Sequence, residues 1–347
     1  MINSWTNRNS LPLFIAATCE FSRFDDPKIT SAGEWVLLNP DGGSIGLYTT
    51  TRLAWSDPNF KFNKIIYENA FKIIDGEYQR LGDMMRIAKT RMNSSQNIKN
   101  IVLLGDPALQ LAYPKHWVET DSIVKQDLTS ANDTILAMAS ITVYGGIEDL
   151  DGNSLEDFNG KLYSTVYDKE IRNQTLGNDG GSYPAYFHLQ SSELYKGIST
   201  IKDGKFEFSF VAPKDIAYDY GNGKISYYAY DTLTYDDAHG YENALVGGMD
   251  DDAEMDYQGP EISLYMNSTD FVDGGYTDRN PVLLAYFNDE QGINSTGNGI
   301  GHNIVMYLDD LTNQPVYLDK LYVPNIDDFQ QGSVVYPFYN LEDGLHT

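Results

Sequence analysis

A single cysteine is the side chain in this sequence that is best suited to nucleophilic chemistry. Cys19 is the only cysteine among 347 residues, and it directly follows an apolar run at residues 11–18. Such a run is typical of a strand buried on both faces of a sheet, and ligands of open α/β sheets bind beyond the carboxyl ends of the strands. A thiol at this position could therefore face a substrate. Most lone cysteines are small buried apolar residues, however, and position alone favours that structural interpretation.

Histidine is the usual base that turns a cysteine into a thiolate nucleophile. All five histidines follow Cys19 in the chain: His116, His188, His239, His302 and His346. We interpret His116 as a linker residue, and the other four lie in the β-rich part of the sequence. In caspases the histidine precedes the cysteine by roughly 50 residues, whereas only 18 residues precede Cys19. Two alternatives remain: Cys19 is inert, or the chain begins inside its catalytic domain.

Other motifs with catalytic or ligand-binding spacing fail on their context. Residues 42–46 match G-x-S-x-G, but a serine elbow must open a helix, and here a strand is expected. Residues 297–302 look like a dinucleotide loop whose sixth position is His302 instead of glycine. Residues 149–157 fit a calcium loop poorly and are interpreted as a hairpin turn. One cysteine excludes an intrachain disulfide and a multi-thiolate zinc site, and we predict neither a metal nor a cofactor.

The charge of the chain is strongly negative and unevenly distributed. The sequence holds 24 Lys+Arg and 50 Asp+Glu, a net charge of −26. Residues 1–118 hold 13 basic and 11 acidic residues, whereas residues 119–347 hold 11 basic and 39 acidic residues. Because phosphate binding depends on Lys and Arg, nucleic acid is not an expected partner. No apolar run reaches the roughly 18 residues of a membrane-spanning helix, and the N-terminus lacks the pattern of a signal peptide.

The spacing of apolar residues predicts an α/β fold for residues 1–118. Strands are expected where short apolar or β-rich runs occur, at residues 11–18, 44–51 and 100–104. Helices are expected at residues 59–74 and 77–91, and a shorter one begins at the capping box of Ser31 and Glu34. This alternation predicts a parallel sheet, with Cys19 at the end of a central strand and the start of the Ser31 helix close to it.

The signals change to those of an all-β protein after this part. Short tyrosine-rich alternating segments are separated by turn dipeptides, which is typical of β-sandwiches. An acidic run at residues 250–256 is expected to link two such modules. We therefore predict three domains, at residues 1–118, 119–258 and 259–347, with the first junction between Pro114 and Asn132.

Residues 17–27 (ATCEFSRFDDP) resemble the gingipain family of cysteine peptidases, and within it the C-terminal signal peptidases of the type IX secretion system. The resemblance runs across nearly the whole chain. It extends to residues 31–35 (SAGEW), 42–52 (GGSIGLYTTTR), 105–109 (GDPAL), 206–211 (FEFSFV), 221–228 (GNGKISYY) and 292–302 (GINSTGNGIGH). It implies the C-terminal part of a caspase-like domain in residues 1–118, followed by two immunoglobulin-like β-sandwich modules, the second incomplete.

The resemblance assigns the catalytic nucleophile to Cys19 and so overturns the inert interpretation. The backbone N–H of Cys19 is implied to form half of the oxyanion hole. Trp55 matches a tryptophan that lines the specificity pocket of gingipains, with a core aromatic at a strand end as the alternative. The family's catalytic histidine lies in a Gly-His-Gly segment upstream of the cysteine, and no such segment precedes Cys19. We therefore expect a fragment, truncated at both ends, that is inactive alone.

The function implied by the resemblance is that of a cysteine endopeptidase and transpeptidase on the outer-membrane cell surface. Its substrates would be secreted proteins with C-terminal sorting domains, and an amine of lipopolysaccharide would be an acceptor. Partners would include outer-membrane components of the secretion system such as PorV. Export would use a signal peptide that this chain does not contain. The alternative is a non-catalytic cell-surface binding or adhesion protein that carries a degenerate peptidase remnant.

Overall fold

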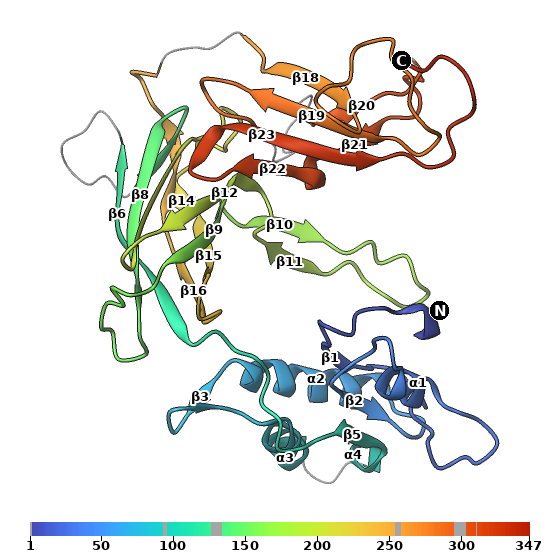
Figure 1. The fold of residues 1–347 in the computed structure, drawn as a ribbon. Coiled ribbons are helices and arrows are strands. Elements are labelled where there is room, and N and C mark those ends of the chain that lie inside the picture. Colours follow the sequence, from blue (N-terminus) through green and yellow to red (C-terminus); the bar gives the residue numbers. More distant parts are fainter. Residues whose placement is uncertain (1, 93–95, 126–133, 254–257, 295–302, 310) are drawn as a thin grey trace. The chain divides into compact units, whose positions relative to one another are not determined.

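The computed structural model describes all residues except 1, 93–95, 126–133, 254–257, 295–302 and 310 (Figure 1). The chain forms two compact units, Met1–Tyr113 and Pro114–Thr347, and each is described by itself. Parts of the two predicted linkers, His302 and the dinucleotide-like segment lie outside the described residues. The three-domain division stays a prediction.

The first unit contains a mixed three-stranded sheet in the order β1-β2-β5. β1 (Leu13–Ile15) runs parallel to β2 (Gly46–Thr50), as predicted. β5 (Ile101–Gly105) is antiparallel to β2, so the prediction of a parallel sheet is wrong for this strand. β1 lies at the edge of the described sheet, and β2 is its central strand. The prediction that Cys19 follows a central strand is therefore wrong as well.

The direction of β5 follows from the two long helices that precede it. α2 (Ser56–Ala70) begins beyond the end of β2, and α3 (Leu81–Met92) packs against it. The first residue of α3 donates its backbone N–H to the Leu109 carbonyl (2.9 Å), just past the end of β5. The short α4 (Gln96–Asn100) then ends beside Thr51, whose N–H donates to the Asn100 carbonyl (2.8 Å). Two helices in succession thus return the chain to the end of β2, so β5 must run the opposite way.

A small hairpin separates these helices where the sequence predicts helical residues. β3 (Ile73–Ile74) pairs with β4 (Glu77–Tyr78) around Asp75 and Gly76. Both turn residues have positive φ, 56° and 81° respectively. A two-residue loop with positive φ at both positions is the favoured hairpin turn because its twist matches that of the flanking strands. It ends α2 and delays the start of α3.

The shortest predicted helix forms where its capping box predicts it. α1 (Ala32–Leu38) starts after Ser31, and a 3-10 turn, η1 (Ile2–Ser4), precedes β1. The Glu34 carboxylate accepts hydrogen bonds from the Ser31 backbone N–H (2.8 Å) and hydroxyl (2.7 Å). These bonds lower the pKa of Glu34, because they favour the ionised carboxylate.

β2 carries the core of the first unit, since all five of its residues are buried. Tyr48 is 1% exposed, packs edge-on against Phe62 of α2 and donates its hydroxyl to the Leu81 carbonyl (2.7 Å). Burial raises the pKa of Tyr48 well above its ordinary value. Both long helices therefore pack on the face of β2 that carries Tyr48.

The second unit is built mainly of strands. Its largest sheet contains β12 (Glu193–Ile201), β9 (Gly160–Tyr167), β15 (Lys224–Asp231), β16 (Asp237–Glu242), β6 (His116–Lys125), β8 (Ser140–Glu148) and β13 (Lys205–Val211), in that spatial order. All neighbours are antiparallel except β16 and β6. The two edge strands, β12 and β13, are consecutive in the chain, and Lys202 and Lys205 exchange backbone hydrogen bonds (2.9 and 3.0 Å) across the turn. The sheet must therefore curl until its edges meet at this turn.

Smaller sheets complete this part of the second unit. One contains β14 (Gly221–Asn222), β17 (Leu245–Met249) and β7 (Thr134–Ala137), and a ribbon pairs β10 (Ile171–Gln174) with β11 (Tyr186–Leu189). A buried ion pair joins Lys125 to Asp250, with the ammonium 2.5 Å from the carboxylate. The prediction of a β-rich second part is confirmed, and the immunoglobulin-like layout stays a prediction.

A four-stranded sheet follows in the order β18-β19-β23-β22. Its strands are β18 (Glu261–Met266), β19 (Val282–Asn288), β23 (Asp328–Pro337) and β22 (Tyr322–Asn325), accompanied by β20 (Val305–Met306), β21 (Val316–Tyr317) and the 3-10 turn η2 (Asp319–Leu321). The turn between β22 and β23 reaches β12, because the Asp327 N–H donates to the Ile198 carbonyl (2.9 Å). None of the helices in the described part of the chain is both long and apolar enough to cross a membrane.

Candidate active site around Cys19

Cys19 lies four residues past the end of β1, beyond the carboxyl end of that strand. The ladder with β2 continues for one more bond, from the Ala16 N–H to the Tyr48 carbonyl (2.8 Å). The Thr50 hydroxyl then donates to the Thr18 carbonyl (2.5 Å) and holds the residue before the cysteine. Cys19 itself is exposed. The structure thus places the thiol at the carboxyl end of a parallel strand, with solvent access, and the interpretation of Cys19 as a buried core residue does not apply.

The thiol is held by the backbone of a single residue from the loop after β2. The Cys19 Sγ donates to the Ala54 carbonyl (3.2 Å), and the Ala54 N–H donates back to the sulfur (3.4 Å). This pair of contacts joins two loops that are 35 residues apart in the sequence. It fixes the sulfur beside Trp55, the next residue of the chain.

The backbone at Cys19 turns sharply. Glu20 has a φ of 52°, the left-handed region that residues with a side chain seldom adopt. Its N–H donates to the Arg52 carbonyl (3.4 Å). Among the described residues, no acceptor takes the backbone N–H of Cys19. An N–H that is free next to a nucleophilic sulfur is the group that an oxyanion hole requires.

A charged cluster flanks the thiol. Arg52 binds Asp25 through both carboxylate oxygens, at 2.9 and 2.5 Å. The hydrogen bond from Arg52 lowers the pKa of Asp25, so this exposed carboxylate stays ionised. Arg23 lies between Glu20 (3.8 Å) and Asp26 (3.6 Å). Because the pairs are exposed, they orient the loop more than they stabilise it.

The loop that carries Cys19 is clamped between β2 and α1. The Ser22 N–H donates to the Thr50 carbonyl (3.0 Å), and the Ser22 hydroxyl bonds the hydroxyl of Thr49 (2.8 Å). On the other side, the Gly33 N–H donates to the Phe21 carbonyl (2.9 Å). The start of α1 therefore lies against the residues that follow the cysteine, as the sequence predicts.

Trp55 is an exposed residue that directly follows Ala54, whose backbone contacts the thiol. It is 77% exposed and occupies the N-cap position of α2, where its backbone N–H donates to the Asn97 side-chain oxygen (3.0 Å). The alternative of a core aromatic is therefore wrong. Its indole is exposed, and its role in specificity stays a prediction.

The first unit contains no histidine, because the first one in the chain is His116. In the second unit, His239 packs against Trp117 (4.5 Å between ring centroids), and burial lowers its pKa. His346 bonds the Asp309 carboxylate (2.9 Å). The unit that holds the thiol thus provides a nucleophile, a free backbone N–H and an exposed aromatic side chain, but no imidazole base.

The segment that resembles a calcium loop has the geometry of a turn. No three His, Cys, Asp or Glu side chains in them are grouped as metal ligands would be. In the calcium-like segment, Asp149 accepts bonds from the N–H groups of Asp151 and Asn153 (2.9 Å each). These bonds are those of a turn, the interpretation that the sequence favoured.

Sequence reasoning missed the residues that surround the thiol. Ala54, Arg52 and Asp25 reach Cys19 or its loop only because β2 lies next to β1, and none of them belongs to a motif with a fixed spacing. The parallel pairing of the two strands was the available signal, since it brings the segments after both strands to the same edge.

Comparisons with known proteins find a family match for the first unit. Residues 1–112 match the model of peptidase family C25. No curated protein matches the chain. A crystal structure of dimeric latent PorU from Porphyromonas gingivalis is 27% identical and covers 80% of this chain, with a TM-score of 0.44. This chain spans only 27% of the length of that PorU chain.

Two gingipain structures are more distant. A complex of the RgpB pro- and mature domains from Porphyromonas gingivalis is 15% identical, covering 69% of this chain and 48% of that one, with a TM-score of 0.30. The Arg-specific cysteine proteinase gingipain R is also 15% identical, covering 71% and 48%, with a TM-score of 0.27. Residues 1–112 are therefore similar to peptidase family C25, and this matched part of the chain contains the exposed thiol.

Proposed function

We propose that this chain is the Cys19-bearing part of a gingipain-type cysteine endopeptidase. One observation carries the proposal: the family match covers residues 1–112, and this same unit holds the only cysteine of the chain, exposed beyond the carboxyl end of a parallel strand. The match supports a cysteine peptidase, and the position of the thiol supports Cys19 as its nucleophile.

The proposed reaction is acyl transfer through a thioester. The Cys19 thiolate attacks the scissile carbonyl carbon, and the free backbone N–H of Cys19 donates to the developing oxyanion. Collapse of the tetrahedral intermediate breaks the C–N bond, and a protonated histidine gives its proton to the leaving amine. Water or another amine then attacks the thioester and regenerates the thiol. By the family resemblance the histidine belongs to a Gly-His-Gly segment, and residues 1–18 contain none.

The finer function that we propose is the one implied by the resemblance to signal peptidases of the type IX secretion system. The substrates are secreted proteins with C-terminal sorting domains, and the acceptor amine belongs to lipopolysaccharide. The protein works on the outer-membrane cell surface with components such as PorV. The resemblance of residues 17–27 supports this assignment.

The test compares the complete gene product with its Cys19→Ala variant on a purified cargo protein that carries a sorting domain. Wild type should release the sorting domain, and the variant should not, while both bind the cargo. Ser22→Ala serves as a matched control, because it changes a hydroxyl in the same loop and leaves the thiol. Cleavage by Cys19→Ala would overturn the nucleophile assignment.

The 347-residue chain by itself should not hydrolyse peptides, since its first unit has no histidine. The measurement is release of fluorophore from a peptide library, with and without a reducing agent. Thiol-dependent hydrolysis that disappears in Cys19→Ala would contradict this expectation and point to His116 as the base. If the complete gene product also lacks Cys19-dependent activity, the alternative of a surface binding protein with a peptidase remnant stands.

A further inference from the structure

The curled sheet of the second unit has two edges that the structure treats differently. The edge of β12 is occupied by the turn between β22 and β23. The Asp327 carboxylate accepts the Thr200 N–H (2.6 Å) and hydroxyl (2.5 Å), and the Asp327 N–H donates to the Ile198 carbonyl (2.9 Å). Apart from the bridge of Lys205 to Lys202 at the turn, β13 pairs only with β8, so the rest of its outer edge has no strand partner among the described residues.

The register shows which backbone groups of β13 are free. Gly204 and Ala212, which lie just before and just after β13, both bond toward β8. The Gly204 carbonyl accepts the Ile147 N–H (2.9 Å), and the Ala212 N–H donates to the Ala139 carbonyl (3.0 Å). Even-numbered residues of β13 therefore face β8, because the N–H and C=O of one residue in an antiparallel ladder point to the same side. The odd-numbered residues Glu207, Ser209 and Val211 direct their N–H and C=O groups away from it.

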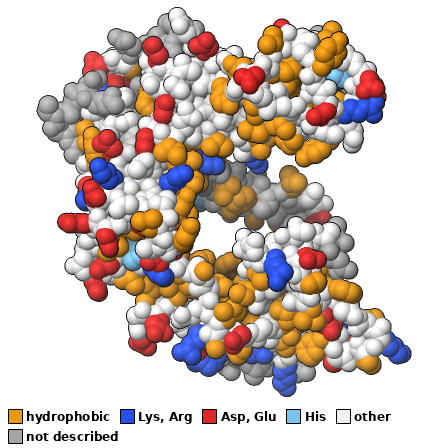
Figure 2. Space-filling view, in the orientation of Figure 1, with side chains coloured by type: hydrophobic (Ala, Val, Ile, Leu, Met, Phe, Trp, Pro, Cys, Tyr) orange, Lys and Arg blue, Asp and Glu red, His pale blue; other side chains and the backbone are white. Residues whose placement is uncertain are grey.

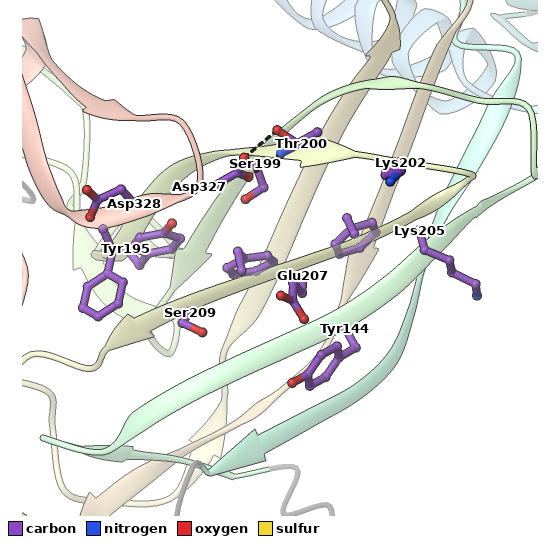
Figure 3. A pocket seen from close by; sticks show the side chains of 13 residues that line it. Tyr144, Tyr195, Ser199, Thr200, Lys202, Lys205, Glu207, Ser209, Asp327 and Asp328 are labelled. Carbon is purple, nitrogen blue, oxygen red and sulfur yellow. Dashed lines mark hydrogen bonds between the residues drawn. The ribbon is translucent and has the colours of Figure 1, made fainter.

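A cavity of about 630 Å³ lies along this free edge. Figure 3 shows its lining side chains, which come from β12 and β13, from Tyr144 of β8 and from Asp327 and Asp328 at the start of β23. Lys202 and Lys205 lie at one end of the cavity, and Asp328 lies at the other. Tyr195, Phe206 and Phe208 contribute aromatic rings to the lining. The cavity thus begins as an aromatic-lined hollow directly beside the unpaired backbone groups.

An unpartnered hydroxyl belongs to the same cavity. Ser199 of β12 lines it, is 0% exposed, and its hydroxyl oxygen has no hydrogen-bond partner among the described residues. A buried polar group without a partner costs free energy. A ligand that enters the hollow with a donor or acceptor would supply the missing bond.

We propose that the outer edge of β13 binds an extended, lysine- or arginine-bearing polypeptide segment of a partner protein as an added strand. Strand addition takes its affinity from main-chain hydrogen bonds and its specificity from alternate side chains. Glu207, Ser209 and Val211 offer the main-chain groups. Side chains on one side of the added strand enter the hollow beside Ser199, and those on the other side meet the exposed Glu207.

The charge of this part of the chain selects a cationic segment. Residues 119–347 carry 39 acidic and 11 basic residues, and Figure 2 shows acidic side chains spread over the second unit. At the cavity, Lys202 and Lys205 lie at the closed end, where Lys205 pairs with Asp121 (3.0 Å), and Glu207 and Asp328 lie away from that end. A basic side chain opposite Glu207 is therefore favoured, and an acidic one is repelled.

The test uses the full chain and a fluorescein-labelled peptide of alternating sequence, Lys-Val-Lys-Thr-Lys-Val-Lys. Ser209→Pro removes an N–H that faces away from β8, a change that edge strands tolerate. It should weaken binding of the peptide by at least about tenfold, the equivalent of one lost hydrogen bond with added steric exclusion. Ser209→Ala is the matched control, since both variants lose the bond between the Ser209 and Thr142 hydroxyls (2.8 Å). It should bind the peptide as wild type does.

Amide hydrogen exchange on the wild-type chain tests the proposal without relying on the folding of a variant. The peptide should protect the amides of Glu207, Ser209 and Val211 and leave those of the intervening phenylalanines unchanged. Glu207→Lys should weaken binding of the lysine peptide and strengthen binding of the matched glutamate peptide. Unchanged exchange at these three amides, equal binding by Ser209→Pro, or equal affinity of wild type for both peptides would each overturn the proposal. Protection that grows with protein concentration alone would assign the edge to a second copy of this chain.

Discussion

At the scale of single residues, substitution of Trp55 should affect catalytic activity and leave stability almost unchanged. Its side chain is 77% exposed and makes no packing contribution to the core. We predict that Trp55→Ala changes the free energy of unfolding by less than about 0.5 kcal/mol, the range of surface substitutions. In the complete gene product the same change should lower kcat/KM for peptide cleavage. Urea denaturation and peptidase assays measure the two effects, and a large loss of stability would contradict an exposed position.

His346 is a second residue with a measurable signature. Its ring bonds the Glu342 carbonyl (2.8 Å) and the Asp309 carboxylate (2.9 Å), and both partners raise the pKa of His346, because the protonated ring donates from both nitrogens. The bond from His346 lowers the pKa of Asp309. We predict that Asp309→Asn lowers the pKa of His346, read from its ring proton in an NMR titration. Asp343→Asn, which removes a carboxylate paired with Arg279, should leave it unchanged.

The sign of the pH dependence follows from these two shifts. The contribution of His346 to the free energy of unfolding is fully present below the unfolded-state pKa of about 6.5. It is lost as pH rises through the raised pKa of the folded state. The contribution of Asp309 to the free energy of unfolding is present above the unfolded-state pKa of about 3.9. It is lost as pH falls through the lowered pKa of the folded state. The pair should therefore protect residues 309 and 346–347 from hydrogen exchange most strongly between about pH 4 and pH 6.5. Protection that increases above pH 8 would contradict this assignment.

At the scale of elements, the contact between α1 and the cysteine loop allows no additional atom. A Cβ on Gly33 would lie 1.7 Å from the Ser22 Oγ and 2.8 Å from its Cβ, and Ser22 is itself fully buried. We predict that Gly33→Ala destabilises the first unit by about 1–3 kcal/mol, the usual cost of overpacking. Chemical denaturation followed by tryptophan fluorescence measures the effect. Gly180→Ala is the control, because no atom lies within 4 Å of the added Cβ.

The elements of the first unit show what local patterns predict and what they do not. The capping box of Ser31 and Glu34 predicts α1, and the apolar run before Cys19 predicts β1, because both signals are local. The spacing of apolar residues predicts that the two long helices include Ile73 and Glu77. It does so because this spacing carries no information about the positive φ angles of Asp75 and Gly76. The antiparallel direction of β5 depends on how α2 and α3 pack, which no spacing within one element reports.

The candidate site divides in the same way. The position of Cys19 after a buried strand is readable from the sequence, and so is a tryptophan at the end of the next one. The contacts of Ala54 with the sulfur and of Arg52 with Asp25 arise from parallel pairing of β1 and β2, between residues 27 to 35 positions apart. The free edge of β13 is even harder to predict from the sequence, because it depends on where a seven-stranded sheet ends.

At the scale of the whole molecule, the two units should respond differently to proteases. β6 begins at His116 and is paired with both β8 and β16, so the second unit is already ordered just after the junction at residue 114. We predict that limited proteolysis leaves a resistant fragment that starts near residue 114, at the early end of the junction expected between Pro114 and Asn132. Mass spectrometry of the fragments measures the start. A resistant product that spans both units would show that they unfold as one.

The solitary Cys19 also sets a limit on covalent assembly. A chain with one thiol has a valence of one in disulfide chemistry, so oxidation can join two copies and then must stop. Ladders of higher oligomers on a non-reducing gel would have to be held by other forces. Because the chain has one cysteine, a thiol-reactive spectroscopic label would attach at one defined place in the first unit. A paramagnetic or fluorescent group there would report on anything that approaches the candidate site.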